Sequence, residues 1–204
     1  MNKKGFTLIE IIAVIVIIGV LLLIAVPAVS SIIFSSRDKT YATNASTFMS
    51  EVDTLYKTKQ YGPLLEENQI MIVPIKDVTF DKNNFTNSPY GAYVYNKSYV
   101  IIERSNYGYK LYATILDDSS RGVLEAPYES INNDDVKVRD ESDYVDLDSY
   151  YTCTQSGDGC DCDTKNAVFR FKSNQYKPVE TRDYNLDGCV TADGYYPLIV
   201  MNKQ

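Results

Sequence analysis

A long apolar run near the N-terminus places the strongest constraint on what this chain can fold into. From Ile11 to Ser36 there are 26 residues without a charge, most of them Ile, Val, Leu and Ala. A helix rises about 1.5 Å per residue, so this run reaches roughly 39 Å and can cross a bilayer core. Lys3 and Lys4 precede it and favour a cytoplasmic N-terminus. A secretory signal peptide or an ordinary membrane anchor shares these features, although a signal-peptide core is usually shorter.

One acidic residue distinguishes this run from an ordinary anchor. Glu10 lies at the start of the apolar run, four residues after Phe6. An uncompensated carboxylate inside a bilayer costs on the order of a few kcal/mol, so an intramembrane charge indicates a functional residue with a partner. Cleavage after Gly5 would create an α-amino group on Phe6, and the amine of a neighbouring copy could then pair with Glu10.

The residues from Lys3 to Glu10 read KKGFTLIE and are followed by about twenty apolar residues. This pattern resembles the class III signal of type IV pilins and pseudopilins. The resemblance implies that a prepilin peptidase cleaves between Gly5 and Phe6 on the cytoplasmic side and N-methylates Phe6. It also implies that Glu10 neutralises the terminal amine of an adjacent subunit during filament assembly. Pro27 matches the helix-breaking proline of the family, and its ring and missing N–H would kink or locally melt the helix.

After the apolar run, hydrophobic residues continue on one side of a helix only. Spacings of four and three residues predict an amphipathic helix, with an apolar stripe formed by Tyr41, Ala45, Phe48, Val52 and Leu55. Gly62 and Pro63 predict its end. We therefore expect a leader at residues 1–5, a helix at residues 6–60 and a globular head at residues 61–204. Within the helix, residues 6–36 would form the transmembrane or filament-core part, and residues 37–60 the amphipathic part.

The head has the pattern of an antiparallel sheet. Apolar and tyrosine-rich stretches predict strands at residues 69–78, 91–95, 99–104, 109–116, 167–171 and 195–201. The polar and acidic residues 117–148 are expected to form an irregular surface segment with one short strand. The predicted fold class is α+β, a long N-terminal α-helix packed on an antiparallel β-sheet, which is also the fold that the resemblance to type IV pilins implies.

All four cysteines lie in the C-terminal part of the chain, at Cys153, Cys160, Cys162 and Cys189. On an exported head, four cysteines suggest two disulfides, for which three connectivities can be drawn. Cys160 and Cys162 are too close in sequence to pair comfortably, so each is expected to pair with Cys153 or Cys189. A structural Zn²⁺ held by the four cysteines is the alternative, although the spacing lacks the usual C-x₂₋₄-C knuckle.

A second candidate metal site follows at residues 183–188, which read DYNLDG. This sequence fits the opening of a calcium loop, in which alternating side-chain oxygens converge on the cation and the glycine permits a sharp turn. The candidate ligands of a structural Ca²⁺ are Asp183, Asn185, Asp187, Thr191 and Asp193. The twelfth position is Gly194 and no amphipathic helix pair flanks the loop, so an EF-hand is not expected. An Asx-rich turn without a metal is the alternative.

Composition excludes several classes of function. The chain has no His, which excludes catalysis and zinc binding through imidazole. With 20 basic and 27 acidic residues and a net charge of −7, it lacks the basic surface that nucleic-acid binding requires, so no nucleic acid is expected as a partner. No motif places a nucleophile with a catalytic base, so the chain is not expected to be an enzyme, and no cofactor is required.

The resemblance implies a structural role. The chain would be a single-pass precursor in the cytoplasmic membrane with its head outside, and then a subunit of an extracellular type IV pilus built from copies of itself and other pilins. Such filaments serve adhesion, motility or surface interaction. The implied partners are the prepilin peptidase and the pilus assembly machinery in the membrane. The alternatives are a minor pilin that acts as an adhesin, and a pseudopilin of a type II secretion or DNA-uptake system.

Overall fold

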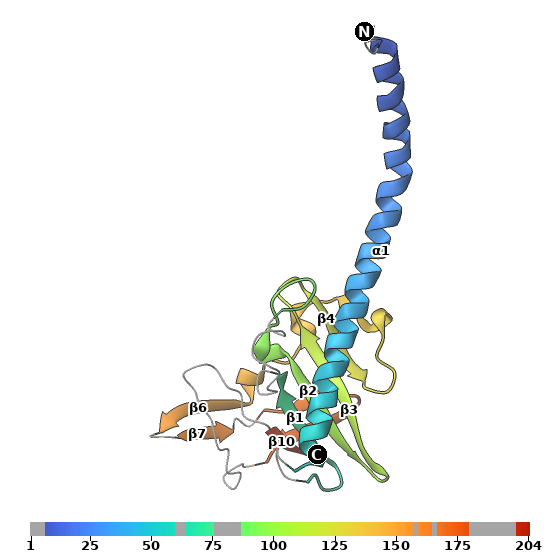
Figure 1. Cartoon of the computed structure of the whole chain (residues 1–204). Helices are drawn as coiled ribbons and strands as arrows, with labels where there is room; N and C mark the ends of the chain where they lie inside the picture. Colours follow the sequence, from blue (N-terminus) through green and yellow to red (C-terminus); the bar gives the residue numbers. More distant parts are fainter. Residues whose placement is uncertain (1–6, 60–63, 76–86, 157–158, 165–166, 180–198) are drawn as a thin grey trace.

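The computed structural model describes residues 7–59, 64–75, 87–156, 159–164, 167–179 and 199–204. Its N-terminal element is a single helix, α1 (Leu8–Lys57), of 50 residues. The first half of α1 projects away from the head and the second half lies along it (Figure 1). The buried side chains of α1 all lie in this second half, at Tyr41, Ala42, Ala45, Phe48, Met49, Val52 and Tyr56. The apolar stripe is thus where the sequence predicts it, except that Leu55 is only partly buried.

The head contains an eight-stranded sheet in the order β5-β4-β3-β2-β1-β10-β9-β8, in which every neighbouring pair is antiparallel. Its strands are β1 (Gln69–Pro74), β2 (Tyr99–Ser105), β3 (Gly108–Leu116), β4 (Arg121–Pro127), β5 (Lys137–Val138), β8 (Phe169–Phe171), β9 (Asn174–Pro178) and β10 (Ile199–Lys203). Short 3₁₀ helices connect some of them, at η2 (Tyr95–Lys97), η3 (Asn133–Asp135), η4 (Glu141–Asp143) and η5 (Leu147–Ser149). A separate hairpin consists of β6 (Tyr151–Ser156) and β7 (Gly159–Thr164). The predicted α+β class is confirmed.

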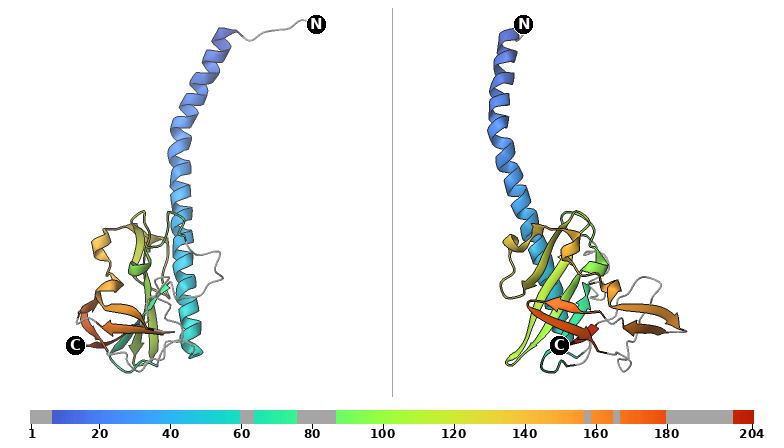
Figure 2. Two further views of the ribbon diagram at one scale, coloured as in Figure 1. Left: turned by 90° about the vertical axis from the view of Figure 1, so that its left-hand side faces the viewer. Right: turned by 180° about the vertical axis from the view of Figure 1, so that it is seen from behind.

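The sheet is covered on both faces. Alternate side chains of β1 point to opposite sides, so Met71 and Val73 belong to the core beneath α1, whereas Ile70 and Ile72 belong to a second core. That second core also includes Leu147 of η5 and Phe169 of the edge strand β8. The hairpin β6–β7 projects from the side of the head away from α1 (Figures 1 and 2).

Two predictions about the head were wrong. Residues 91–95 form isolated bridges at Ala92 and Tyr93 in place of a strand, and the Tyr93 ring packs edge-on against Tyr41 and Phe48 of the helix. Residues 117–148 contain the full-length strand β4 and the short β5, not one short strand.

Other strand boundaries differ as well. The strand predicted at 69–78 ends at Pro74, a residue that cannot donate a ladder hydrogen bond. The strand predicted at 167–171 is shorter, and β9 follows it unpredicted. The strand predicted at 195–201 is described only from Ile199.

Candidate functional site: the apolar helix and its junction with the head

The N-terminus of α1 is closed by a reciprocal capping box between Thr7 and Glu10. The Thr7 backbone N–H and the Thr7 hydroxyl each donate to Glu10 Oε2 at 2.7 Å. The Glu10 N–H donates to Thr7 Oγ1 at 3.4 Å. These bonds satisfy backbone donors that a helix start otherwise leaves unpaired. In the single chain, Glu10 is therefore held at its own helix terminus; Gly5 and Phe6 lie outside the described residues.

The free part of α1 is a continuous apolar surface. Large hydrophobic side chains between Leu8 and Phe34 are 47% to 79% exposed. Within the described residues, α1 is the one helix long and apolar enough to cross a membrane, and none of its apolar window is buried in the head. An apolar surface of this extent indicates contact with lipid or with other protein.

Pro27 lies inside α1 without interrupting it. Proline removes one backbone donor and crowds the preceding turn, and Ser30 Oγ donates to the Val26 carbonyl at 2.9 Å in the same turn. The upper part of the helix is gently curved (Figure 2). The sequence left open whether Pro27 kinks the helix or melts it locally. Within the described residues α1 continues through Pro27 without local melting.

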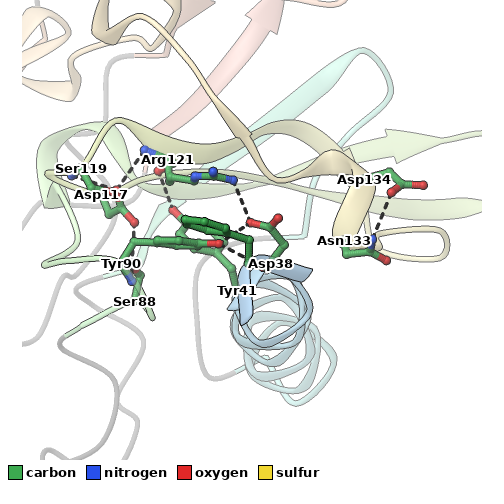
Figure 3. Close-up of polar contacts among 10 residues, drawn as sticks. Asp38, Tyr41, Ser88, Tyr90, Asp117, Ser119, Arg121, Asn133 and Asp134 are labelled. Carbon is green, nitrogen blue, oxygen red and sulfur yellow. Dashed lines mark hydrogen bonds and ion pairs between the residues drawn. The ribbon is translucent and has the colours of Figure 1, made fainter. Parts of the chain in front are cut away.

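Where α1 meets the head, residues from both form a neck cluster, which we define as Phe34, Arg37, Asp38, Tyr90 and Arg121 (Figure 3 shows three of them). Arg121 Nη1 lies 2.9 Å from Asp38 Oδ1, and the Tyr90 hydroxyl donates to the same oxygen at 2.8 Å. The Tyr90 hydroxyl also lies 3.2 Å from the Phe34 carbonyl. The Arg121 guanidinium stands 4.7 Å from the centre of the Tyr90 ring, and the Arg37 guanidinium stands 5.6 Å from it. Burial and the hydrogen bond to Asp38 raise the pKa of Tyr90 to about 12.

A buried carboxylate fixes the two head segments that supply the neck cluster. Asp117 is 1% exposed and accepts hydrogen bonds from Ser88 Oγ at 2.5 Å and Ser119 Oγ at 2.6 Å. It also accepts from the Arg121 N–H at 3.0 Å. Since a buried charge is tolerated only when its hydrogen bonds are made, this arrangement defines the turn between β3 and β4 and ties it to the segment before Tyr90 (Figure 3).

Tyr41 and Tyr109 attach α1 to the sheet. The Tyr41 hydroxyl lies 3.1 Å from the Arg121 carbonyl and 3.3 Å from the Ile115 carbonyl, and burial raises its pKa. Nearer the C-terminus of α1, the Tyr109 hydroxyl donates to Asp53 Oδ1 at 2.6 Å. Together with the neck cluster, these bonds hold the helix to the head over its whole outer half. Sequence reasoning did not find these contacts, because the paired residues lie 52 to 83 positions apart.

Three of the four cysteines lie in the hairpin β6–β7. Its register places Cys153 opposite Cys162 and Gln155 opposite Cys160. Cys189 lies outside the described residues, and so do all the candidate calcium ligands. Among the side chains that the structure describes, no group of three or more His, Cys, Asp or Glu could hold a metal ion.

Comparison with known proteins identifies the N-terminus. Residues 1–26 match the family model of the prokaryotic N-terminal methylation motif, the class III signal peptide of type IV pilins. The match includes Gly5, Phe6 and Glu10 and ends one residue before Pro27. No curated protein and no solved structure matches the chain. The predicted prepilin-type N-terminus is therefore confirmed.

Proposed function

We propose that this chain is a structural subunit of a type IV pilus, assembled through α1 into an extracellular filament. The methylation motif supports a pilin-like or pseudopilin protein. The observation that carries the proposal is the division of α1, whose motif-bearing half exposes its apolar side chains while its other half is bound to the head. An ordinary membrane anchor would require neither the motif nor Glu10.

The proposed path begins in the cytoplasmic membrane, where the precursor spans the bilayer once with its head outside. Prepilin peptidase then cleaves after Gly5 and methylates Phe6. Cleavage removes two lysines, so the net charge falls from −7 by two, to −9, and mature heads repel one another. In lipid the apolar side chains already avoid water, so helix association depends on packing and polar pairing.

Glu10 supplies that polar pairing. In the single chain one of its oxygens, Oε2, accepts both bonds from Thr7. A carboxylate has two oxygens and about four acceptor sites, so Glu10 can retain its cap and still accept from the amine of a neighbouring Phe6. Each incoming subunit would then be placed in register by one ion pair, which lowers the cost of keeping the acid in an apolar environment.

The test compares Glu10→Ala with a control substitution, Glu51→Ala, which changes a carboxylate on the outer half of α1. We expect Glu10→Ala to lower the yield of sheared filaments while the membrane pool and leader cleavage persist, and Glu51→Ala to retain filaments. Intact mass of the membrane and filament pools reports removal of residues 1–5 and the added methyl group. Normal filament yield from Glu10→Ala would contradict the proposed role of Glu10.

Two related roles use the same N-terminal motif. A minor pilin that acts as an adhesin would give sparse or tip labelling by immunogold electron microscopy, whereas a major subunit labels the whole filament. A pseudopilin would give a secretion or DNA-uptake defect on deletion, without loss of surface fibres. The structural Ca²⁺, and the cysteine disulfides or the alternative Zn²⁺, remain proposals for the head in each role.

A further inference from the structure

The length of α1 determines which residues meet the outer surface of the membrane. From Leu8 to Arg37 the helix rises about 44 Å at about 1.5 Å per residue. A bilayer with its headgroups is about 40–45 Å thick. Arg37 is also the first charged residue after the apolar run. When the helix spans the membrane from Leu8, Arg37 therefore lies among the outer phospholipid headgroups.

The head reaches the same level, since Tyr90 and Arg121 contact the last turn of the apolar segment directly. The Tyr90 hydroxyl binds the Phe34 carbonyl and Asp38, and Arg121 binds Asp38. No linker separates the span from the head, because α1 continues through both. The side of the head that carries Tyr90 and Arg121 must then touch the headgroup layer. Phe34 of α1 lies at the same level and is 49% exposed.

The two arginines of the neck cluster differ in what neutralises them. Arg121 is paired with Asp38. Arg37 is exposed, stacks over the Tyr90 ring, and takes part in none of the ion pairs found among the described residues. Two arginines against one aspartate give the cluster a net charge of about +1, although the whole chain carries −7. A guanidinium matches the geometry of a phosphate group, and aromatic rings favour the membrane–water interface.

We propose that the neck cluster is a lipid-binding collar, in which the Arg37 guanidinium binds a phospholipid phosphate of the outer leaflet and the rings of Phe34 and Tyr90 lie at the same depth. The collar holds the head upright on the membrane before the subunit enters a filament. This inference rests on the membrane-anchored precursor of the proposed function and adds to it a partner of defined chemistry, the phosphate of a lipid headgroup.

The test measures the distance between arginine and phosphorus directly. The full chain, labelled with ¹³C at arginine Cζ, is reconstituted in vesicles of phosphatidylcholine and phosphatidylglycerol, and ¹³C–³¹P dephasing is recorded by solid-state NMR. The chain has six arginines, so the signal is assigned by substitution. We expect dephasing that Arg37→Lys removes, because lysine keeps the charge but carries no labelled Cζ. Arg104→Lys is the matched control, since Arg104 binds the Gly108 carbonyl in the β2–β3 hairpin and should not contribute.

Each other outcome has a defined meaning. Dephasing that is absent from the wild-type chain, or unchanged in Arg37→Lys, overturns the collar if the chain still resists extraction from the vesicles by alkaline carbonate. Release of the chain by carbonate would instead overturn the membrane-anchored precursor, and the collar with it. A filament defect in Glu10→Ala is independent of all these results.

Discussion

Replacing Arg121 by glutamine should weaken the attachment of the head to α1 at Asp38. The side chains of Arg121 and Asp38 are 22% and 19% exposed, so their ion pair lies nearer to the buried than to the exposed limit. A hydrogen bond to a charged group contributes about 1.5–3 kcal/mol, whereas an exposed ion pair contributes about 0.2–1 kcal/mol. The stacking of Arg121 on Tyr90 adds about 0.5–1 kcal/mol. Because Tyr90 still binds Asp38 in the variant, we expect a net loss of about 2 kcal/mol.

The assay is thermal unfolding of the full chain in detergent, followed by near-ultraviolet circular dichroism of its tyrosines. For a chain of this size, about 1 kcal/mol changes the melting temperature by about 2–4 °C, so Arg121→Gln should melt about 4–8 °C lower. Arg104→Gln is the control, because Arg104 makes one exposed hydrogen bond to a carbonyl. A double-mutant cycle with Asp38→Asn isolates the interaction energy between Arg121 and Asp38. Equal losses for Arg121→Gln and Arg104→Gln would refute the idea that the neck cluster contributes to stability.

The remaining predictions concern three other features of the head. The free energy of unfolding should fall as the pH rises from 10 towards 12. The pKa of Tyr90 is raised from 10.0 to about 12 in the folded state, so the folded state binds this proton more tightly than the unfolded state does. In alkaline unfolding curves, the Tyr90→Phe chain should lose less stability over that range. Oxidised protein should yield a disulfide-linked peptide pair containing Cys153 and Cys162, which are partners in the hairpin register. Peptide mapping that finds only other cysteine pairs, or a bound zinc, would exclude the Cys153–Cys162 disulfide. Gly122→Ala should cost about 1–3 kcal/mol, since a Cβ there would meet the Tyr144 hydroxyl, and a melting temperature equal to that of the wild-type chain would argue against this close contact.

The features that the sequence predicts correctly are local ones. A charge-free run and a stripe with spacings of three and four residues can be recognised within a short window, because a helix forms hydrogen bonds between residues four apart. The methylation motif is likewise contiguous, so it can be recognised from the first ten residues. The strands β2 and β3 were also predicted nearly to their ends, since strand-forming residues and a short turn lie side by side in the chain.

Tertiary structure alone determined the rest of the head. The strand β4 includes Gly122 and Pro127 and lacks a clear alternation, and it exists because β3 offers an edge and the core accepts Val123. The neck cluster joins Asp38 to a tyrosine 52 positions away and to an arginine 83 positions away. No local pattern encodes such pairs, because they form only after the sheet has packed on α1 and excluded water from between them. The sequence by itself thus determined the methylation motif and the long apolar helix, whereas packing determined which side chains of the head meet that helix.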